Sequence, residues 1–275
     1  AISNVVHAFA KVHFAKVIDC SILFERMGQV VARMSPQDFS PQSISLLCRS
    51  FSKLQDESRS ARVVLNRLLQ VVESMPKGGF NLQGIAMILR SVHAGDVERK
   101  EERYSYYFQL VKGMSPAKMS SQGPRSISEM FEVLEKLNWQ DQSLLLLLSQ
   151  RAIETEEYAW MPTWVVAVLS AARHFGLIRT QPLLFAHLAR AVQHIKPTRP
   201  FHQDPPTIHE FSIRDLAALA DVYSDPMIFD ESIFWHVAAI AQQFPERYWD
   251  ASSLTTCLKS FYKTGQNDMF MYKYF

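Results

Sequence analysis

A pattern that recurs about every 41 residues constrains this chain more than any other feature. Its clearest copy, residues 40–54, has an apolar stripe at helical spacing that consists of Ile44, Leu47, Phe51 and Leu54. Arg49 and Lys53 are four residues apart and share a different face of the same helix. Pro41 fits the first turn, where its missing N–H costs nothing. The segment therefore predicts an amphipathic helix that opens a repeating unit.

The same spacing marks the ends of the units. A proline closes the second helix of each unit, because proline cannot continue the hydrogen-bond ladder of a helix. Large apolar residues follow these closing segments at spacings of 41, 39 and 41 residues, namely Phe39, Phe80, Met119 and Trp160. We expect each of them to be buried between one repeat and the next. Self-similarity at this period in a helical sequence predicts an α-solenoid.

We therefore expect an all-α protein, folded as a right-handed α-solenoid of about six to seven helical-hairpin repeats of about 41 residues. The 275 residues would form a single domain with repeats at residues 1–39, 40–80, 81–120, 121–160, 161–210, 211–249 and 250–275, the last one incomplete. The fifth repeat contains a proline-rich insert at 196–210, which predicts a loop. In the fourth, a run of five leucines at 144–148 predicts a helix that is buried on several sides. Because the chain starts and stops inside helical patterns, we expect it to be part of a longer protein.

Composition excludes several classes of protein. The chain is 48% hydrophobic and 20% charged, which is typical of a globular protein with a large core. Its three cysteines (Cys20, Cys48 and Cys257) form no CxxC pair and indicate buried thiols in a reducing compartment. The longest uncharged runs, such as residues 161–172, fall short of the roughly 20 residues that a membrane-spanning helix needs. We therefore expect no membrane partner.

Catalytic patterns are missing from the sequence. It contains no phosphate-binding Gly-rich loop, no HExxH motif and no kinase motif. Paired acids such as Glu156 and Glu157 lie where helices begin or end, and there they complement the helix dipole. His202 and His209 lie in the proline-rich insert without a further ligand at metal spacing. We predict that the protein is not an enzyme, has no catalytic residues and uses neither a cofactor nor a metal.

The net charge of +2 is unevenly spread along the chain. Residues 1–125 hold 17 Lys and Arg against 10 Asp and Glu, a net +7, whereas residues 126–275 hold 12 against 17, a net −5. We expect the basic N-terminal repeats to meet a polyanion such as RNA, and the acidic C-terminal repeats to meet other proteins. Chance variation in surface charge is the alternative explanation.

Basic residues recur near the ends of the first helices of the repeats. In a solenoid such positions line up on one face, where they could meet the phosphates along an RNA backbone. The candidate RNA-binding residues are Lys11, Arg49, Lys53, Arg90, Lys136, Arg173, Lys259 and Lys263. His7 stands in the same row, and Glu132 interrupts it. The alternative is a solvated helix face, or salt bridges between neighbouring repeats.

The pattern of the first helix, Ile-x-x-Leu-x-x-Ser-Phe-Ser-Lys-Leu at residues 44–54, resembles the helical repeats of FAST-kinase-like and RAP-domain proteins. It is also similar to the octotricopeptide and heptatricopeptide repeats of organellar proteins, and residues 5–12 are the second-best match. Later repeats depart from the pattern, since Ala94 and Arg173 stand where lysine is expected, and these 275 residues contain no RAP domain. The resemblance implies RNA binding in mitochondria or another organelle. The functions that the resemblance implies are RNA processing, translation and structural roles within the mitochondrial ribosome.

Residues and resemblance together predict a non-catalytic RNA-binding helical-repeat protein, foremost a structural component of the mitochondrial ribosome or of a related organellar ribonucleoprotein. The partner RNA would be ribosomal RNA, bound through the N-terminal repeats. Two alternatives stay open: a scaffold for protein–protein contacts in a mitochondrial complex, and an organellar factor for RNA processing or stability.

Overall fold

The computed structural model of the protein describes residues 2–14, 19–54, 59–95, 97–195 and 211–266. Within these ranges the chain forms fourteen α-helices and four short 3₁₀ helices, and it contains no strand. None of the helices so described is long and apolar enough to cross a membrane. The prediction of an all-α protein is confirmed. The predicted loop at 196–210 lies outside the described residues.

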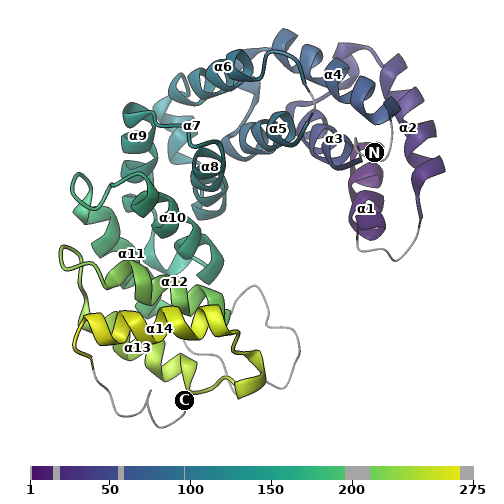
Figure 1. Cartoon of the computed structure of the whole chain (residues 1–275). Coiled ribbons are helices and arrows are strands. Elements are labelled where there is room, and N and C mark those ends of the chain that lie inside the picture. The colour runs from purple at the N-terminus through teal and green to yellow at the C-terminus, as the bar shows by residue number, and fades with distance from the viewer. Residues whose placement is uncertain (1, 15–18, 55–58, 96, 196–210, 267–275) are drawn as a thin grey trace. The chain divides into compact units, whose positions relative to one another are not determined.

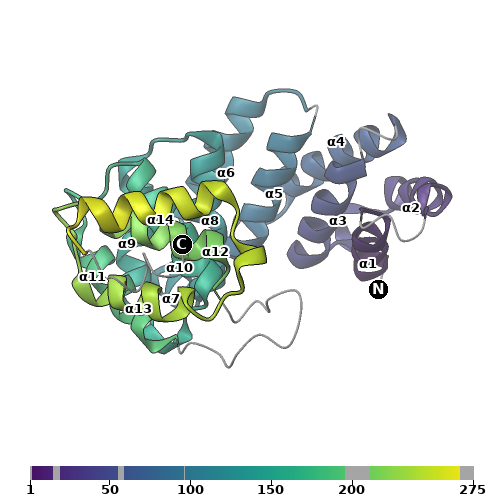
Figure 2. The same ribbon diagram turned by 60° about the horizontal axis from the view of Figure 1, so that its bottom comes forward.

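The chain divides into two compact units, Ala1–Gln122 (unit 1) and Gly123–Phe275 (unit 2). In both units the first helix of one hairpin packs against the first helix of the next, as Figures 1 and 2 show from two sides. The division lies two residues after the boundary expected between the third and fourth repeats, which is at 120–121.

Unit 1 has two layers of helices. The first layer consists of α1 (Ile2–Phe14), α3 (Pro41–Leu54) and α5 (Leu82–Ala94). The second layer consists of α2 (Ser21–Arg33), α4 (Arg59–Ser74) and α6 (Lys100–Lys112). The short helices η1 (Pro36–Asp38), η2 (Lys77–Gly79) and α7 (Pro116–Ser120) lie where hairpins end. Because α3 packs against both α1 and α5, equivalent positions of successive hairpins become neighbours (Figure 1).

Unit 2 repeats this arrangement. Its first layer consists of α8 (Pro124–Leu137), α10 (Pro162–His174), α12 (Ile213–Tyr223) and α14 (Ala251–Lys263). Its second layer consists of α9 (Gln142–Ile153), α11 (Pro182–His194) and α13 (Glu231–Ala241). The short helices η3 (Glu157–Ala159) and η4 (Glu246–Tyr248) stand at hairpin ends.

Polar side chains fix where several helices begin. The Asn81 side chain accepts a hydrogen bond from the Gly84 backbone N–H at 2.7 Å and caps α5. Ser212 and Asp215 form a capping box at the start of α12. These residues satisfy backbone donors that have no partner inside the helix. The local sequence therefore sets the helix boundaries on which the alignment of the hairpins depends.

The large apolar residues predicted to lie between repeats are buried. Phe39, Phe80, Met119 and Trp160 are each at most 6% exposed. Phe211, which is 2% exposed, precedes the cap of α12 just as Phe80 precedes the cap of α5. The sequence spacing misses Phe211, because the insert before it lengthens the repeat.

One expectation about the core is wrong. Helix α9 carries five leucines in a row, yet only one side of it is buried: Leu144 and Leu148 are fully buried, whereas Leu146 is 39% exposed. Helix α9 belongs to the second layer of unit 2, where it packs against α8 and α11. A helix in such a two-layer array has one protected face, whatever its composition.

Candidate nucleic-acid interface

The packing of α1 against α3 brings four basic residues of unit 1 together. We call them the α1–α3 basic cluster, and its members are His7, Lys11, Arg49 and Lys53. Lys11 and Lys53 are exposed, whereas His7 and Arg49 are partly buried. Each pair on one helix is four residues apart, which puts both members on one helical face. Three of the four, Lys11, Arg49 and Lys53, are candidates that the sequence predicts.

The pKa values of two members of the cluster are shifted by the charges of the other members. The pKa of Lys53 is lowered, first by partial burial and then by the positive charges of Arg49 and Lys11. The pKa of His7 is lowered by partial burial and then by Lys11, Arg49 and Lys53. Each of these charges disfavours a further positive charge at its neighbours. The charges that shift the pKa values of Lys53 and His7 are therefore positive.

The composition of the first layer of unit 1 reinforces this field. Helices α1, α3 and α5 contain no aspartate or glutamate. The whole unit holds 16 Lys and Arg against 10 Asp and Glu, a net +6. Lys11 and Lys53 lie in the last turns of their helices, where the helix dipole stabilises a cation. The dipole accounts for a lysine at each helix end, but not for the gathering of four basic groups.

His7 has a defined neighbour within the cluster. Its Nδ1 lies 3.4 Å from the Ser50 hydroxyl, and that hydroxyl donates a hydrogen bond to the Leu46 carbonyl at 2.8 Å. Since the hydroxyl hydrogen is used, the Ser50 oxygen acts as acceptor toward His7. The neutral imidazole then carries its hydrogen on Nδ1, and Nε2 is the nitrogen that takes up a proton.

Arg90 holds the equivalent position on α5, next to α3 in the same layer. Its side chain is partly buried. Arg90 is not among the charges that shift the pKa of His7 or Lys53. We therefore do not count Arg90 among the members of the basic cluster.

The corresponding row of unit 2 is different. Arg173 of α10 forms an ion pair with Asp221 of α12, so the next helix supplies an acid to a predicted RNA contact. Lys263 Nζ lies 3.3 Å from the Ser224 hydroxyl. Lys259 is exposed on α14. Basic charge in this row is thus partly balanced within the protein.

Lys136, the remaining candidate, is exposed near the end of α8. The same helix carries three acids, namely Glu129, Glu132 and Glu135. Unit 2 as a whole holds 13 Lys and Arg against 17 Asp and Glu, a net −4. Its surface is therefore a poorer match for a polyanion than that of unit 1.

Two other charged clusters are balanced internally. Glu157 pairs with Arg190 and lies 3.4 Å from Nε2 of His194 and 3.7 Å from Nδ1 of His187. These contacts fasten η3 to α11, and the Arg190 hydrogen bond is the main reason that the pKa of Glu157 is lowered. In unit 1, Arg103 Nε lies 3.0 Å from a Glu73 carboxylate oxygen, which joins α6 to α4. Both clusters therefore hold neighbouring elements of the fold together.

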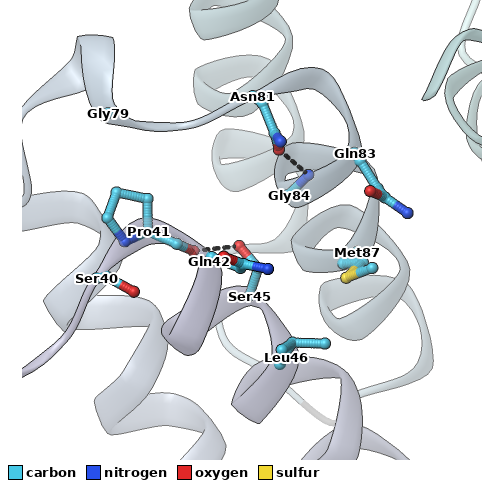
Figure 3. Close-up of a pocket in the computed structure, with 10 residues that line it drawn as sticks. All are labelled: Ser40, Pro41, Gln42, Ser45, Leu46, Gly79, Asn81, Gln83, Gly84 and Met87. Carbon is cyan, nitrogen blue, oxygen red and sulfur yellow. Dashed lines mark hydrogen bonds between the residues drawn. The ribbon is translucent and has the colours of Figure 1, made fainter. Parts of the chain in front are cut away.

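A pocket of about 370 Å³ opens between the N-terminal halves of α3 and α5 in unit 1. Figure 3 shows Gln42 and Leu46 of α3 on one side and Gln83 and Met87 of α5 on the other. The ten residues around it include neither an acid nor a base. Since the basic cluster lies near the other ends of α1 and α3, the pocket is separate from it along the helices.

Two buried cysteines of the described residues are poorly suited to act as nucleophiles. Burial raises the pKa of the Cys48 and Cys257 thiols to about 12, so neither forms a thiolate near neutral pH. No group of three His, Cys, Asp or Glu side chains in the described ranges could hold a metal ion. His202 and His209, for which the sequence predicts no metal site, lie outside those ranges.

Comparison with known protein families finds no family that matches the chain, and comparison with curated proteins finds no relative.

Proposed function

We propose that the protein is a non-catalytic helical-repeat protein that binds RNA through the α1–α3 basic cluster. The observation that carries the proposal is the positive surroundings of Lys53, whose pKa is lowered by Arg49 and Lys11 after burial. A phosphate backbone beside these groups would relieve their mutual repulsion. The absence of acids from α1, α3 and α5 leaves the first layer of unit 1 suited to such a partner.

Its binding would depend on phosphates more than on bases. Arginine and lysine contacts to phosphates fix the position of a nucleic acid without reading its sequence. Recognition of particular bases in a single strand requires hydrogen bonds to the base edges, whereas stacking on a side chain tolerates any base. Three of the four members of the cluster are lysine or arginine, whose charge is attracted to any phosphate. We therefore propose binding that depends strongly on salt and little on RNA sequence.

In the cell, we place the protein in a mitochondrion or a related organelle, as a structural component of the mitochondrial ribosome or a similar ribonucleoprotein. This assignment is supported by the resemblance of residues 44–54 to organellar repeats. The hairpins would form a right-handed α-solenoid, with about six to seven repeats in the whole chain. Unit 1 would bind ribosomal RNA, while unit 2, with its net charge of −4, would bind neighbouring proteins.

A scaffold that binds only proteins is the second candidate, and one observation in unit 2 favours it. Trp235 on α13 is 56% exposed, with its Nε1 3.3 Å from a Glu231 carboxylate oxygen. Met227 and Phe229, in the connection before α13, are also exposed. Exposed aromatic and methionine side chains are common in protein interfaces. A role in RNA processing or stability would require a further catalytic domain.

Sedimentation of the tagged protein from intact cells, with and without RNase, tests the proposal. Co-migration with ribosomal subunits that collapses under RNase is expected. Association that resists RNase in the parent protein and is lost in Trp235→Ser would overturn the RNA proposal in favour of the scaffold. Cell fractionation of the same material tests the organelle, since recovery in the cytosol alone would exclude it.

A further inference from the structure

His7 is the one titratable group of the basic cluster whose charge changes near neutral pH. After partial burial, its pKa is lowered by the charges of Lys11 on its own helix and of Arg49 and Lys53 on the adjacent helix α3. Ser50, also on α3, approaches its Nδ1 at 3.4 Å. The other helix that packs against α1 is α2, whose charged residues Glu25, Arg26 and Arg33 are exposed. The three charges that lower the pKa of His7 are thus all positive.

We propose that His7 takes up a proton from solvent when the phosphate backbone of RNA binds to the α1–α3 basic cluster, so that the affinity for RNA rises as the pH falls. The inference rests on the proposed function and adds a regulation to the same site. The proton would go to Nε2, because Nδ1 already carries the hydrogen that faces Ser50. The doubly protonated ring then adds a fourth positive charge to the three permanent ones.

The direction of the effect follows from linkage. In the free protein the pKa of His7 lies below its usual value of 6.5, because partial burial and then three cations disfavour the imidazolium. A bound phosphate favours the charged form and raises that pKa. Between the free and the bound pKa the complex holds one more proton than its separate components. In that pH window affinity increases as the pH falls, by at most about tenfold per pH unit for a single proton.

This behaviour separates His7 from the other members of the cluster. Lysine and arginine stay charged throughout the neutral range, so they supply affinity that depends on salt but not on pH. His7 would supply the pH-dependent part. RNA affinity would then respond to changes in acidity for which the permanent charges offer no sensor.

Isothermal titration calorimetry with a 12-nucleotide oligouridylate at low salt measures the linkage. Titrations at pH 7 in two buffers that differ in ionisation enthalpy give the number of protons taken up on binding. We expect a fractional uptake in the parent protein and none in His7→Gln, whose amide keeps a polar group but cannot be protonated. Between pH 8 and pH 6 the parent should gain several-fold in affinity, and His7→Gln should stay at the level that the parent has at pH 8.

The matched control is His174→Gln, the same replacement of an exposed histidine in unit 2, which should retain the proton uptake of the parent. Binding without proton uptake, or an equal pH dependence in parent and His7→Gln, would overturn this inference and leave RNA binding standing. If the oligonucleotide does not bind at any pH, the proposed function and the inference fall together. Circular dichroism of both variants checks that α1 remains helical.

Discussion

Arg173 of α10 forms an ion pair with Asp221 of α12, and a residue that the sequence places in an RNA-binding row is thereby neutralised inside the protein. The two side chains are 38% and 46% exposed, so water screens the pair. We expect Arg173→Gln to leave RNA affinity unchanged and to lower the free energy of unfolding by about 1 kcal/mol at most. Fluorescence anisotropy and urea denaturation measure the two quantities. A marked loss of RNA affinity would show that Asp221 does not compete with RNA.

Removal of the side-chain hydroxyl should have different effects on stability at two fully buried tyrosines. The Tyr223 hydroxyl donates a hydrogen bond to the Phe185 carbonyl at 2.8 Å, whereas the Tyr107 hydroxyl is buried without a hydrogen-bond partner among the described residues. Tyr223→Phe should therefore destabilise the protein by about 1 kcal/mol, the usual net value of a hydrogen bond. Tyr107→Phe should leave stability unchanged or raise it. Equal losses in urea denaturation would indicate that Tyr107 has a partner, such as a buried water.

The buried aromatic residues between hairpins should carry much of the stability. Phe80 is 2% exposed and Trp160 is 3% exposed, and each precedes the first helix of a hairpin. Replacement of either by alanine should cost about 3–5 kcal/mol, because a large cavity is left in the core. Trp235→Ala, at a position that is 56% exposed, is the matched control and should cost far less. A loss near zero for Phe80→Ala would mean that the space between the hairpins can collapse.

Unit 2 should lose stability as the pH falls below about 6.5, the usual pKa of histidine. Burial lowers the pKa of His236, and it lowers that of His187 despite the opposing effect of Glu157. Both rings stay neutral in the folded protein at a pH where the unfolded chain already binds protons. Their contribution is complete above 6.5 and decreases as the pH falls from there toward the folded pKa.

His236→Gln should therefore flatten the dependence of the unfolding free energy on pH between 7.5 and 5.5. The exposed His93 provides the control, since His93→Gln should retain the parent profile. Urea denaturation at several pH values supplies the comparison. An unchanged slope in His236→Gln would show that burial of this ring is not what makes the protein sensitive to acid.

Much of the fold could be predicted because the residues that begin its helices act locally. The starts of α3, α5 and α10 can be predicted from the sequence, because each depends on a residue within one helical turn, namely Pro41, Asn81 and Pro162. The apolar stripe of α3 is likewise a property of one helix. Such signals predict helices and hairpins without knowledge of what packs against them.

The features that could not be predicted depend on contacts between residues that are far apart in the sequence. Asp221 lies 48 residues from Arg173, beyond the insert that disturbs the repeat spacing, so the ion pair has no periodic signal. Leu146 is exposed because α9 belongs to a second layer, which composition alone does not reveal. In the candidate site, the repeat spacing put all four members of the basic cluster in one row and predicted three of them as RNA contacts. It did not predict how strongly they act on His7 and Lys53.

The salt dependence of RNA binding tests the central claim most directly. Anisotropy titrations of a single-stranded RNA, from low to physiological salt, would compare the parent with Lys11→Gln/Lys53→Gln and with Lys136→Gln/Lys259→Gln, two exposed lysines of unit 2. The account predicts that the slope of log affinity against log salt falls by about 1.4 in the first variant, about 0.7 for each lost phosphate contact, and stays constant in the second. Equal slopes in all three proteins would contradict an RNA interface on α1 and α3.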